Sequence, residues 1–198
     1  MSKQAKTAHN LASAPQRVKI LAGQWRATTL PVLLNDEIRP TPSRVRETLF
    51  NWLQPTVAGS RCLDLFAGSG ALGFEAVSRG ADLAVLLDKD RHVARLLTQQ
   101  VEKLKADGVE VICDDAFNYL QQCESAFDII FLDPPFAKFH PFELLKIIDS
   151  KRLLKAGGTV YVEYSIENNT DSVPSGWQWR RHSKAGEVEY GLVEQAQS

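Results

Sequence analysis

Four short, mostly apolar runs, each followed or ended by aspartate, constrain the fold of this 198-residue chain more than any other feature. Segments with the spacing of amphipathic helices separate the runs, and this alternation is typical of a doubly wound parallel α/β sheet. The carboxyl ends of parallel strands meet at one edge of the sheet, where ligands of such folds bind. We therefore expect the aspartates at one site. They are Asp64, Asp88, the neighbours Asp114 and Asp115, and Asp133.

The first of these runs leads into a glycine-rich loop. Gly68, Gly70 and Gly73 have the spacing of the dinucleotide fingerprint, in which glycines allow a tight turn, a close backbone approach and close helix-to-strand packing. A nicotinamide dinucleotide would place its pyrophosphate beside Asp64, where like charges repel strongly. S-adenosylmethionine has cationic sulfonium and amino groups and no phosphate. The carboxylates therefore favour S-adenosylmethionine as the cofactor, with S-adenosylhomocysteine as the product.

Each carboxylate has an expected role toward that cofactor. Asp64 would attract the cationic groups, and Asp88 would hold both ribose hydroxyls. Asp115 would accept the exocyclic amine of adenine, with Asp114 as the alternative. The predicted cofactor-binding residues are Asp64, Phe66, Ala67, Gly68, Ser69, Gly70, Asp88, Lys89, Asp115 and Ala116.

The run at 127–132 ends in the motif Asp133-Pro134-Pro135-Phe136. Two consecutive prolines continue neither a helix nor a ladder, so the chain must leave the sheet at this point. The simplest alternative is a strand-ending turn. A carboxylate, a stiff carbonyl and an aromatic ring at the end of a strand also suit the planar amino group of a nucleic-acid base. Asp133 and the carbonyl of Pro134 would accept the N–H bonds of this amino group, and Phe136 would stack on the base. We predict Asp133, Pro134, Pro135 and Phe136 as catalytic residues, and whether Asp133 also takes the proton stays open.

The total formal charge of −1 conceals an asymmetry. Residues 1–46 carry eight basic and two acidic side chains, a net charge of +6, so the remainder carries −7. A basic extension ahead of an acidic body is typical of proteins that grip phosphate backbones. Two small strands are expected within 17–34, and their alternation would place Arg17 and Lys19 on one face. The predicted RNA-binding residues are Arg17, Lys19, Arg26, Arg39, Arg44 and Arg46.

A helix is expected between Thr41 and Pro55, with Thr41 as its N-cap and Pro42 as its first residue. The chain then divides into a flexible basic tail at 1–16, a hairpin-and-helix extension at 17–54 and a catalytic domain at 55–198. A further strand follows Gly157 and Gly158, and a terminal strand pair is expected around 184–186.

Composition agrees with a single soluble domain. The 44% hydrophobic content is ordinary, and neither a membrane span nor a signal-peptide core is evident. The three cysteines lack metal-ligand spacing and are expected to be buried thiols in a reducing cytoplasm, and no metal site is predicted. Nothing demands more than a monomer.

Several segments together resemble the bacterial 16S ribosomal RNA guanine-N2 methyltransferases of the RsmD type. They are Gly23-Gln24-Trp25-Arg26, residues 39–53, residues 63–73, residues 133–136 and Lys184-Ala185-Gly186, and the resemblance runs from about Arg17 to Val193. It implies a class I S-adenosylmethionine-dependent methyltransferase: a Rossmann-like seven-stranded sheet with an antiparallel terminal strand, preceded by a small β-hairpin. The implied reaction is methylation of one guanine in 16S rRNA, within a small ribosomal subunit or an assembly intermediate. The chain departs from the family at Pro42-Ser43, where threonine and aspartate are frequent.

Two other functions remain open. DNA or RNA methyltransferases that act on adenine N6 or cytosine N4 use similar motifs, but usually have Asn or Ser ahead of the two prolines and a separate target-recognition domain. A non-catalytic RNA-binding module could keep the same fold, although the intact acidic and glycine positions argue against it.

Overall fold

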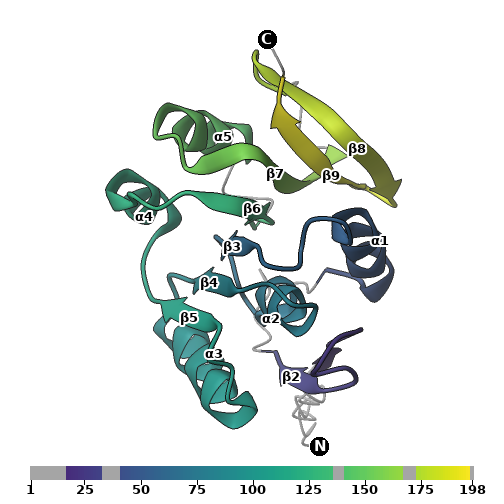
Figure 1. Ribbon diagram of the computed structural model, residues 1–198, viewed down its shortest axis with the longest axis vertical. Helices are drawn as coiled ribbons and strands as arrows, with labels where there is room; N and C mark the ends of the chain where they lie inside the picture. Colours follow the sequence, from purple (N-terminus) through teal and green to yellow (C-terminus); the bar gives the residue numbers. More distant parts are fainter. Residues whose placement is uncertain (1–16, 33–40, 136–140, 167–172, 197–198) are drawn as a thin grey trace, which may run out of the picture.

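The computed structural model describes residues 17–32, 41–135, 141–166 and 173–196. A seven-stranded sheet forms its centre, with strand order β5-β4-β3-β6-β7-β9-β8, and a separate two-stranded hairpin precedes it (Figure 1). The hairpin strands are β1 (Arg17–Lys19) and β2 (Thr29–Pro31). The strands of the large sheet are β3 (Arg61–Asp64), β4 (Leu83–Leu87), β5 (Val109–Ile112), β6 (Phe127–Leu132), β7 (Leu154–Ser165), β8 (Trp177–Ala185) and β9 (Val188–Gln195).

The first five strands of the sheet are parallel, and β9 and β8 close it as an antiparallel pair. The connecting helices are α1 (Ser43–Leu53), α2 (Ala71–Ser78), α3 (Arg91–Leu104), α4 (Ala116–Gln122) and α5 (Pro141–Ser150). The expected doubly wound α/β order is therefore confirmed, including the antiparallel terminal strands.

Two hydrophobic clusters cover the two faces of the sheet. One contains side chains of α1, α2 and α3, and the other contains side chains of α4 and α5. Both form because alternate residues of the buried strands point to opposite faces: Phe131 and Tyr161 belong to the first cluster, and Leu132 and Val162 to the second. This alternation decides which face each carboxylate at the strand ends can reach.

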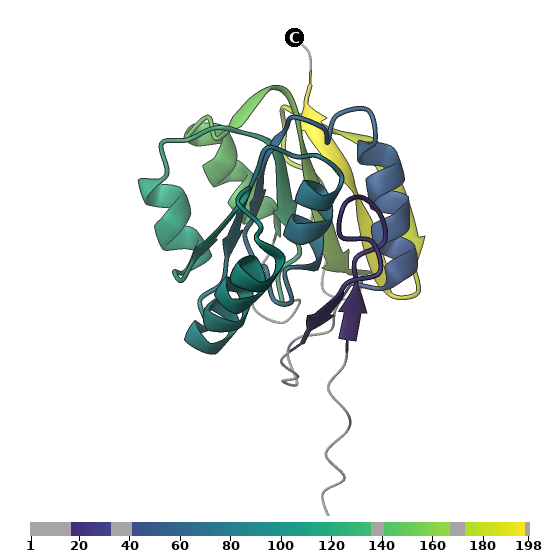
Figure 2. The ribbon, with the colours of Figure 1, turned by 60° about the horizontal axis from the view of Figure 1, so that its bottom comes forward.

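The hairpin lies beside α1 and α2 (Figure 2). Ile20 and Leu30 are buried in the same cluster as Leu49 and Phe50 of α1. The hairpin and α1 therefore share the core of the sheet's α1–α2 face.

Two expectations about local structure were wrong. The N-cap of α1 is Pro42 and its first residue is Ser43, and Thr41 makes no capping bond. Cys62 is buried as expected, but Cys113 is exposed.

No helix among the described residues is long and apolar enough to cross a membrane.

Candidate active site

The predicted aspartates lie at the carboxyl ends of neighbouring strands. The register pairs Asp64, the last residue of β3, with Leu86 of β4 on one side and Phe131 of β6 on the other. Asp88 and Asp133 directly follow these two partner strands. Asp64 also lies within electrostatic reach of both Asp88 and Asp133. The structure therefore brings three of the predicted carboxylates together at one edge of the sheet.

The glycine loop turns sharply from β3 into α2. Gly68 and Gly70 have φ angles of 49° and 74°, in the left-handed region that favours glycine. The N–H of Ala67 donates to the carbonyl of Leu87 (2.9 Å), and this bond fixes the loop against β4. A Cβ on Gly73 would lie 2.4 Å from a methyl group of Leu86, so a glycine there lets α2 pack closely on the sheet.

Asp64 holds this loop from below. Gly70 is the N-cap residue of α2 and has no side chain for capping. The buried carboxylate of Asp64 replaces such a cap, because its Oδ2 accepts the backbone N–H of Gly73 (3.2 Å). Burial, and then the charge of Asp133, raise the pKa of Asp64 to about 7, although the backbone bonds from Gly73 and Phe66 oppose the shift. Sequence reasoning gave Asp64 a charge role and missed this capping role.

Asp88 holds the loop from the neighbouring strand. Its Oδ2 accepts the N–H of Gly68 (3.0 Å), and its Oδ1 accepts the N–H of Asp90 (2.9 Å). Burial raises its pKa, and the same two hydrogen bonds oppose this shift. The side chain is half-buried. Because each carboxylate oxygen has two lone pairs, one at each oxygen remains for a ribose hydroxyl.

The remaining predicted cofactor residues follow strands β3, β4 and β5. Asp115 is the N-cap of α4, and its Oδ1 accepts the N–H of Phe117 (3.0 Å), while Asp114 Oδ1 accepts the N–H of Asp115 (2.7 Å). Ala116 is buried and Lys89 is exposed. The partly buried Phe66 packs against the hydrophobic cluster on the α4–α5 face. Both aspartates are half-buried and follow β5, so the choice of adenine contact between Asp114 and Asp115 stays a prediction.

Asp133 receives a hydrogen bond from a residue distant in the chain. The hydroxyl of Thr41 donates to Asp133 Oδ2 over 2.7 Å, and Thr41 is buried while Asp133 is half-buried. Burial raises the pKa of Asp133 to about 6, against the opposing effect of the Thr41 bond. Pro134 is buried and Pro135 half-buried. Phe136 lies outside the described residues.

A buried glutamate on the next strand is a residue that sequence reasoning missed. Leu132 of β6 pairs with Val162 of β7, so Glu163 is level with Asp133. The hydroxyl of Tyr161 donates to Glu163 Oε2 (2.5 Å), and both side chains are buried. Burial, and then the charge of Asp133, raise the pKa of Glu163 well above its ordinary value. The available signal was a charged residue within an otherwise buried strand pattern.

Four predicted RNA-binding residues, Arg17, Lys19, Arg26 and Arg44, have exposed side chains. Residues 17–19 alternate as expected, with Val18 buried between Arg17 and Lys19. A cleft of about 390 Å³ lies between β1 and the start of α1, and Arg17, Lys19, Thr41 and Ser43 are among its lining residues. This cleft connects the basic strand to the threonine that holds Asp133. Arg39 and the tail at 1–16 lie outside the described residues.

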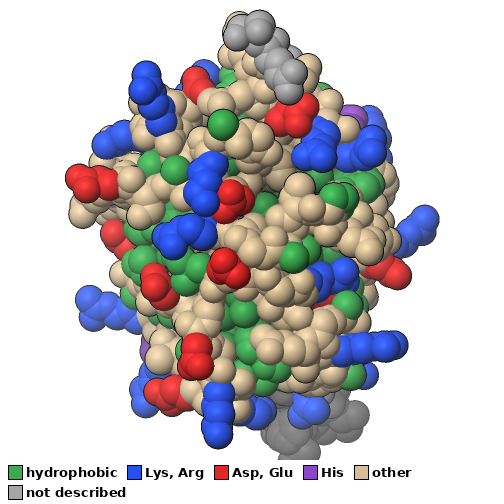
Figure 3. Space-filling model, viewed as in Figure 1, with side chains coloured by type: hydrophobic (Ala, Val, Ile, Leu, Met, Phe, Trp, Pro, Cys, Tyr) green, Lys and Arg blue, Asp and Glu red, His purple; other side chains and the backbone are tan. Residues whose placement is uncertain are grey.

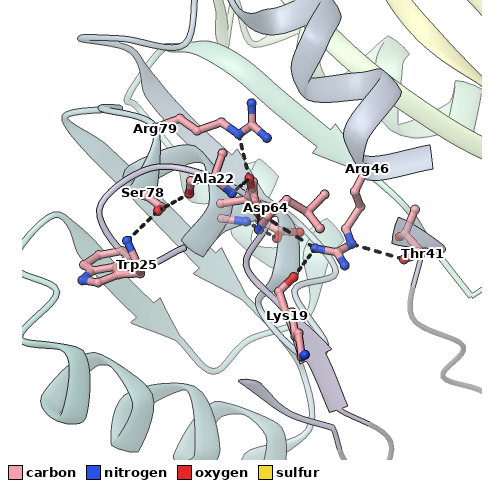
Figure 4. Close-up of polar contacts among 11 residues, drawn as sticks. Lys19, Ala22, Trp25, Thr41, Arg46, Asp64, Ser78 and Arg79 are labelled. Carbon is pink, nitrogen blue, oxygen red and sulfur yellow. Dashed lines mark hydrogen bonds and ion pairs between the residues drawn. The ribbon is translucent and has the colours of Figure 1, made fainter. Parts of the chain in front are cut away.

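Arg46 differs from the other predicted RNA contacts because its side chain is only 3% exposed. Its Nε donates to the carbonyl of Thr41 (3.3 Å), and one terminal nitrogen donates to the carbonyl of Lys19 (3.0 Å) and lies 4.0 Å from Glu75. Figure 4 shows this guanidinium between Lys19 and Thr41. The structure therefore places Arg46 as a clamp between the hairpin and the start of α1, and leaves its side chain little exposed surface for RNA.

The Gly23-Gln24-Trp25-Arg26 turn is tied to α2. Ser78 accepts the N–H of Trp25 at its hydroxyl (3.0 Å), donates that hydroxyl to the carbonyl of Ala22 (2.6 Å), and accepts the N–H of Gln24 at its own carbonyl (2.8 Å) (Figure 4). The buried Glu75 accepts the N–H groups of Leu21 and Ala22. The turn thus anchors the hairpin on the helix that follows the glycine loop.

The donor set fits a cofactor that presents cations and hydroxyl groups. The charge of Asp64 interacts with those of Asp88 and Asp133, and the pKa of each of the three carboxyl groups is raised, mainly by burial. A bound cation beside them would relieve this repulsion, whereas a pyrophosphate would increase it. Among the described residues, no group of three His, Cys, Asp or Glu side chains is arranged to hold a metal ion.

Comparisons with known proteins agree with this geometry. The family described as Conserved hypothetical protein 95 matches residues 18–194. Ribosomal RNA small subunit methyltransferase D of Escherichia coli strain K12 is 41% identical over 182 residues, which cover 92% of each chain. The solved structure of yhhF from Escherichia coli superposes with a TM-score of 0.83 at 41% identity and covers 91% of this chain and 98% of that one. The structure of SMU.776 complexed with SAH shares the fold at 17% identity, with a TM-score of 0.67 and coverage of 91% of this chain and 56% of that one.

Proposed function

Because the chain belongs to the ribosomal RNA small subunit methyltransferase D family, we propose that it methylates the N2 amino group of one guanine in 16S ribosomal RNA. The chain is a methyltransferase of the S-adenosylmethionine-dependent fold class. When bound, S-adenosylmethionine supplies an electrophilic methyl group. The observation that carries the proposal is the position of Asp133, a half-buried carboxylate at the same sheet edge as the glycine loop.

The residues that would hold the cofactor are those around the glycine loop. The backbone of Gly68, Ser69 and Gly70 would form the floor of the cofactor site. Asp88 has lone pairs that would accept the ribose hydroxyls. Asp64 supports the loop and adds negative charge beneath a cationic group. Asp115 and Ala116 would border the adenine, with Phe66, Ala67 and Lys89 on either side.

Asp133 and the carbonyl of Pro134 would orient the target amine. The lone pair of a guanine amino nitrogen is delocalised into the ring, so the amine is a poor nucleophile and needs orientation. Two acceptors on its N–H bonds direct the nitrogen toward the methyl group for in-line displacement. The amino nitrogen loses one proton when it is methylated, and Asp133 is the nearest proposed acceptor for that proton. Pro135 stiffens the turn, and we propose that Phe136 stacks on the base.

RNA would approach over the hairpin. Arg17 and Lys19 are exposed and line the cleft that leads to Thr41, while Arg44 is exposed on the first turn of α1 and Arg26 on the hairpin turn. Basic side chains in this position suit the phosphates that flank a base turned into the site. We assign Arg39 to the same role from its place in the sequence. We further propose a cytoplasmic monomer that acts on a small ribosomal subunit or an assembly intermediate.

Transfer of labelled methyl groups tests the proposal. Small ribosomal subunits and naked 16S rRNA from cells that lack this gene would be incubated with the enzyme and labelled S-adenosylmethionine, and the nucleosides would then be analysed. We expect N2-methylguanosine, and the better substrate identifies the form of RNA used. Label in adenine or cytosine amino groups would instead support the adenine-N6 or cytosine-N4 class, and no label in either substrate would favour a binding module.

Replacement of the central carboxylate tests its role in the same assay. We expect Asp133→Ala to lower the rate of methyl transfer at least about a hundredfold, because an acceptor that orients the nucleophile is lost. S-adenosylmethionine binding, measured by calorimetry, should remain. Asp107→Ala, at an exposed position, is the matched control and should leave the rate unchanged. Normal turnover by Asp133→Ala would disprove the proposed role.

A further inference from the structure

We propose that Thr41 is a positioning residue for the methyl-transfer reaction: it orients Asp133 and connects this carboxylate to the basic hairpin. The inference rests on the proposed role of Asp133. It starts from one contact between residues 92 positions apart, the 2.7 Å bond from the Thr41 hydroxyl to Asp133 Oδ2. The sequence predicts that this hydroxyl caps α1, but it bonds to Asp133 instead.

Local structure explains why the hydroxyl is free to reach Asp133. Pro42 occupies the N-cap of α1 with extended backbone angles (φ −55°, ψ 144°), so Thr41 stands one residue ahead of the helix. The carbonyl of Thr41 is held by Arg46 Nε, and the carbonyl of Pro42 accepts the N–H of Arg46 (3.1 Å). The backbone of Thr41 is therefore fixed from within α1 while its side chain points to the neighbouring strand.

The Thr41 bond leaves one face of Asp133 for substrate. The hydroxyl bonds to Oδ2, and we expect Oδ1 to accept an N–H of the target amine. Among the residues that the structure describes, the other ionisable groups with a charge interaction with Asp133 are Asp64 on β3, and Glu163 and Tyr161 on β7. The two carboxyl groups disfavour ionisation of Asp133 whenever they are charged. The Thr41 hydroxyl acts in the opposite direction and stabilises the carboxylate.

The contacts of Thr41 and Arg46 extend to the hairpin. Arg46 donates both to the carbonyl of Thr41 and to the carbonyl of Lys19, whose side chain is exposed on β1. Two side chains, Arg46 and Thr41, thus join the strand that would grip phosphate to the carboxylate that would receive the amine. A base delivered along β1 therefore meets an acceptor whose position is fixed relative to that strand.

Thr41→Val tests this role, because valine keeps the shape of threonine and removes the donor. We expect the maximal rate of methyl transfer to fall about tenfold or more, while the affinity for S-adenosylmethionine changes less than about twofold. The acidic limb of the pH–rate profile should move to higher pH, because the Thr41 bond lowers the pKa of Asp133. Thr41→Ser should restore both the rate and the limb. Thr48→Val is the matched control, since the Thr48 hydroxyl bonds to Arg44 within the same helix.

Titration of the Asp133 side-chain carboxyl by ¹³C NMR separates this inference from the proposed function. A higher pKa in Thr41→Val than in the wild type is expected even if the RNA target proves to be a different base. Thr41→Ala is the second variant if valine disturbs folding, because it removes the same donor with less bulk. An unchanged titration together with an unchanged rate would overturn the inference. Loss of cofactor affinity in parallel with rate, or failure of Thr41→Ser to rescue, would also overturn it.

Discussion

Asp64 ends β3 and Asp133 directly follows β6, while Glu163 is level with Asp133 on the adjacent strand β7. All three pKa values are raised, mainly because burial disfavours the charged form. At neutral pH these carboxyl groups therefore keep part of their protons. A cation bound beside them would favour their ionised forms. Raised pKa values of several neighbouring carboxyl groups are typical of functional sites.

The raised pKa of Asp64 predicts a specific dependence of stability on pH. Between its ordinary value and about 7, the folded state binds a proton that the unfolded state has lost, so stability falls as pH rises through this window. We expect Asp64→Asn, which keeps an acceptor for Gly73, to reduce the loss of unfolding free energy between pH 5 and 8 by an amount on the order of 2 kcal/mol. Urea denaturation without cofactor at both pH values measures this, with the exposed Asp107→Asn as control. An equal pH dependence in Asp64→Asn and the wild type would contradict the assignment.

Sequence reasoning located most of the chemistry at this scale but not its partners. The aspartates at the carboxyl ends of β3, β4 and β6 were predictable, because a parallel sheet gathers its strand ends whatever the details of packing. Thr41 was misplaced as a helix cap because local preference favours that bond, and the competing bond to Asp133 crosses 92 residues of sequence. Arg46 was counted with the other arginines because composition cannot separate a buried guanidinium from an exposed one.

At the scale of elements, the helices and strands themselves followed from periodicity. The run at 127–132 was predicted with the bounds of β6, since it is a short apolar stretch with clear stops. The strand expected from Thr159 begins at Leu154 instead, with a shift in register against β6 between Phe127 and Ile129. Irregular pairing of this kind depends on the neighbouring strand and leaves no signal in the sequence. Gly157 and Gly158 therefore predict a strand that starts too late.

Docking of the hairpin on α2 gives the element-scale prediction. Gly23 has a φ of +82°, and a Cβ there would lie 1.7 Å from the carbonyl oxygen of Ser78. Gly59 has a similar φ of +74° with nothing within 4 Å, so it isolates the conformational strain from the clash. We expect Gly59→Ala to cost about 1 kcal/mol, and Gly23→Ala about 2 to 5 kcal/mol of hairpin stability.

Hydrogen exchange of the amides at 17–31 measures hairpin opening, and thermal denaturation measures the whole domain. Because Glu75 and Ser78 tie this turn to the helix after the glycine loop, Gly23→Ala should increase exchange in the hairpin more than in β3 or β4. Equal effects of the two substitutions on hairpin exchange would show that the close approach to Ser78 contributes nothing.

At the scale of the whole molecule, charge is divided between the extension and the body. Residues 1–46 carry +6 and the rest −7, while on the face shown in Figure 3 basic and acidic side chains are interspersed over most of the surface. Clustering along the sequence therefore matters more than total charge, which is only −1. The acidic site repels phosphate, and the basic hairpin beside it attracts phosphate. This arrangement favours RNA binding at the rim with one base, and no phosphate, inside the site.

Reversal of the hairpin charges tests this division of labour. We expect Arg17→Glu with Lys19→Glu to weaken RNA binding at least about tenfold and to reduce the slope of log Kd against log salt by about 1 to 2, because phosphate contacts are lost. S-adenosylmethionine affinity should stay the same, since neither side chain lies on the glycine loop. The control replaces two exposed lysines away from the hairpin, Lys103 on the last turn of α3 and Lys146 on α5, by glutamate. If the control variant loses as much RNA affinity, net charge alone governs binding; if cofactor affinity falls equally, the hairpin supports the whole site and does not act as a separate RNA grip.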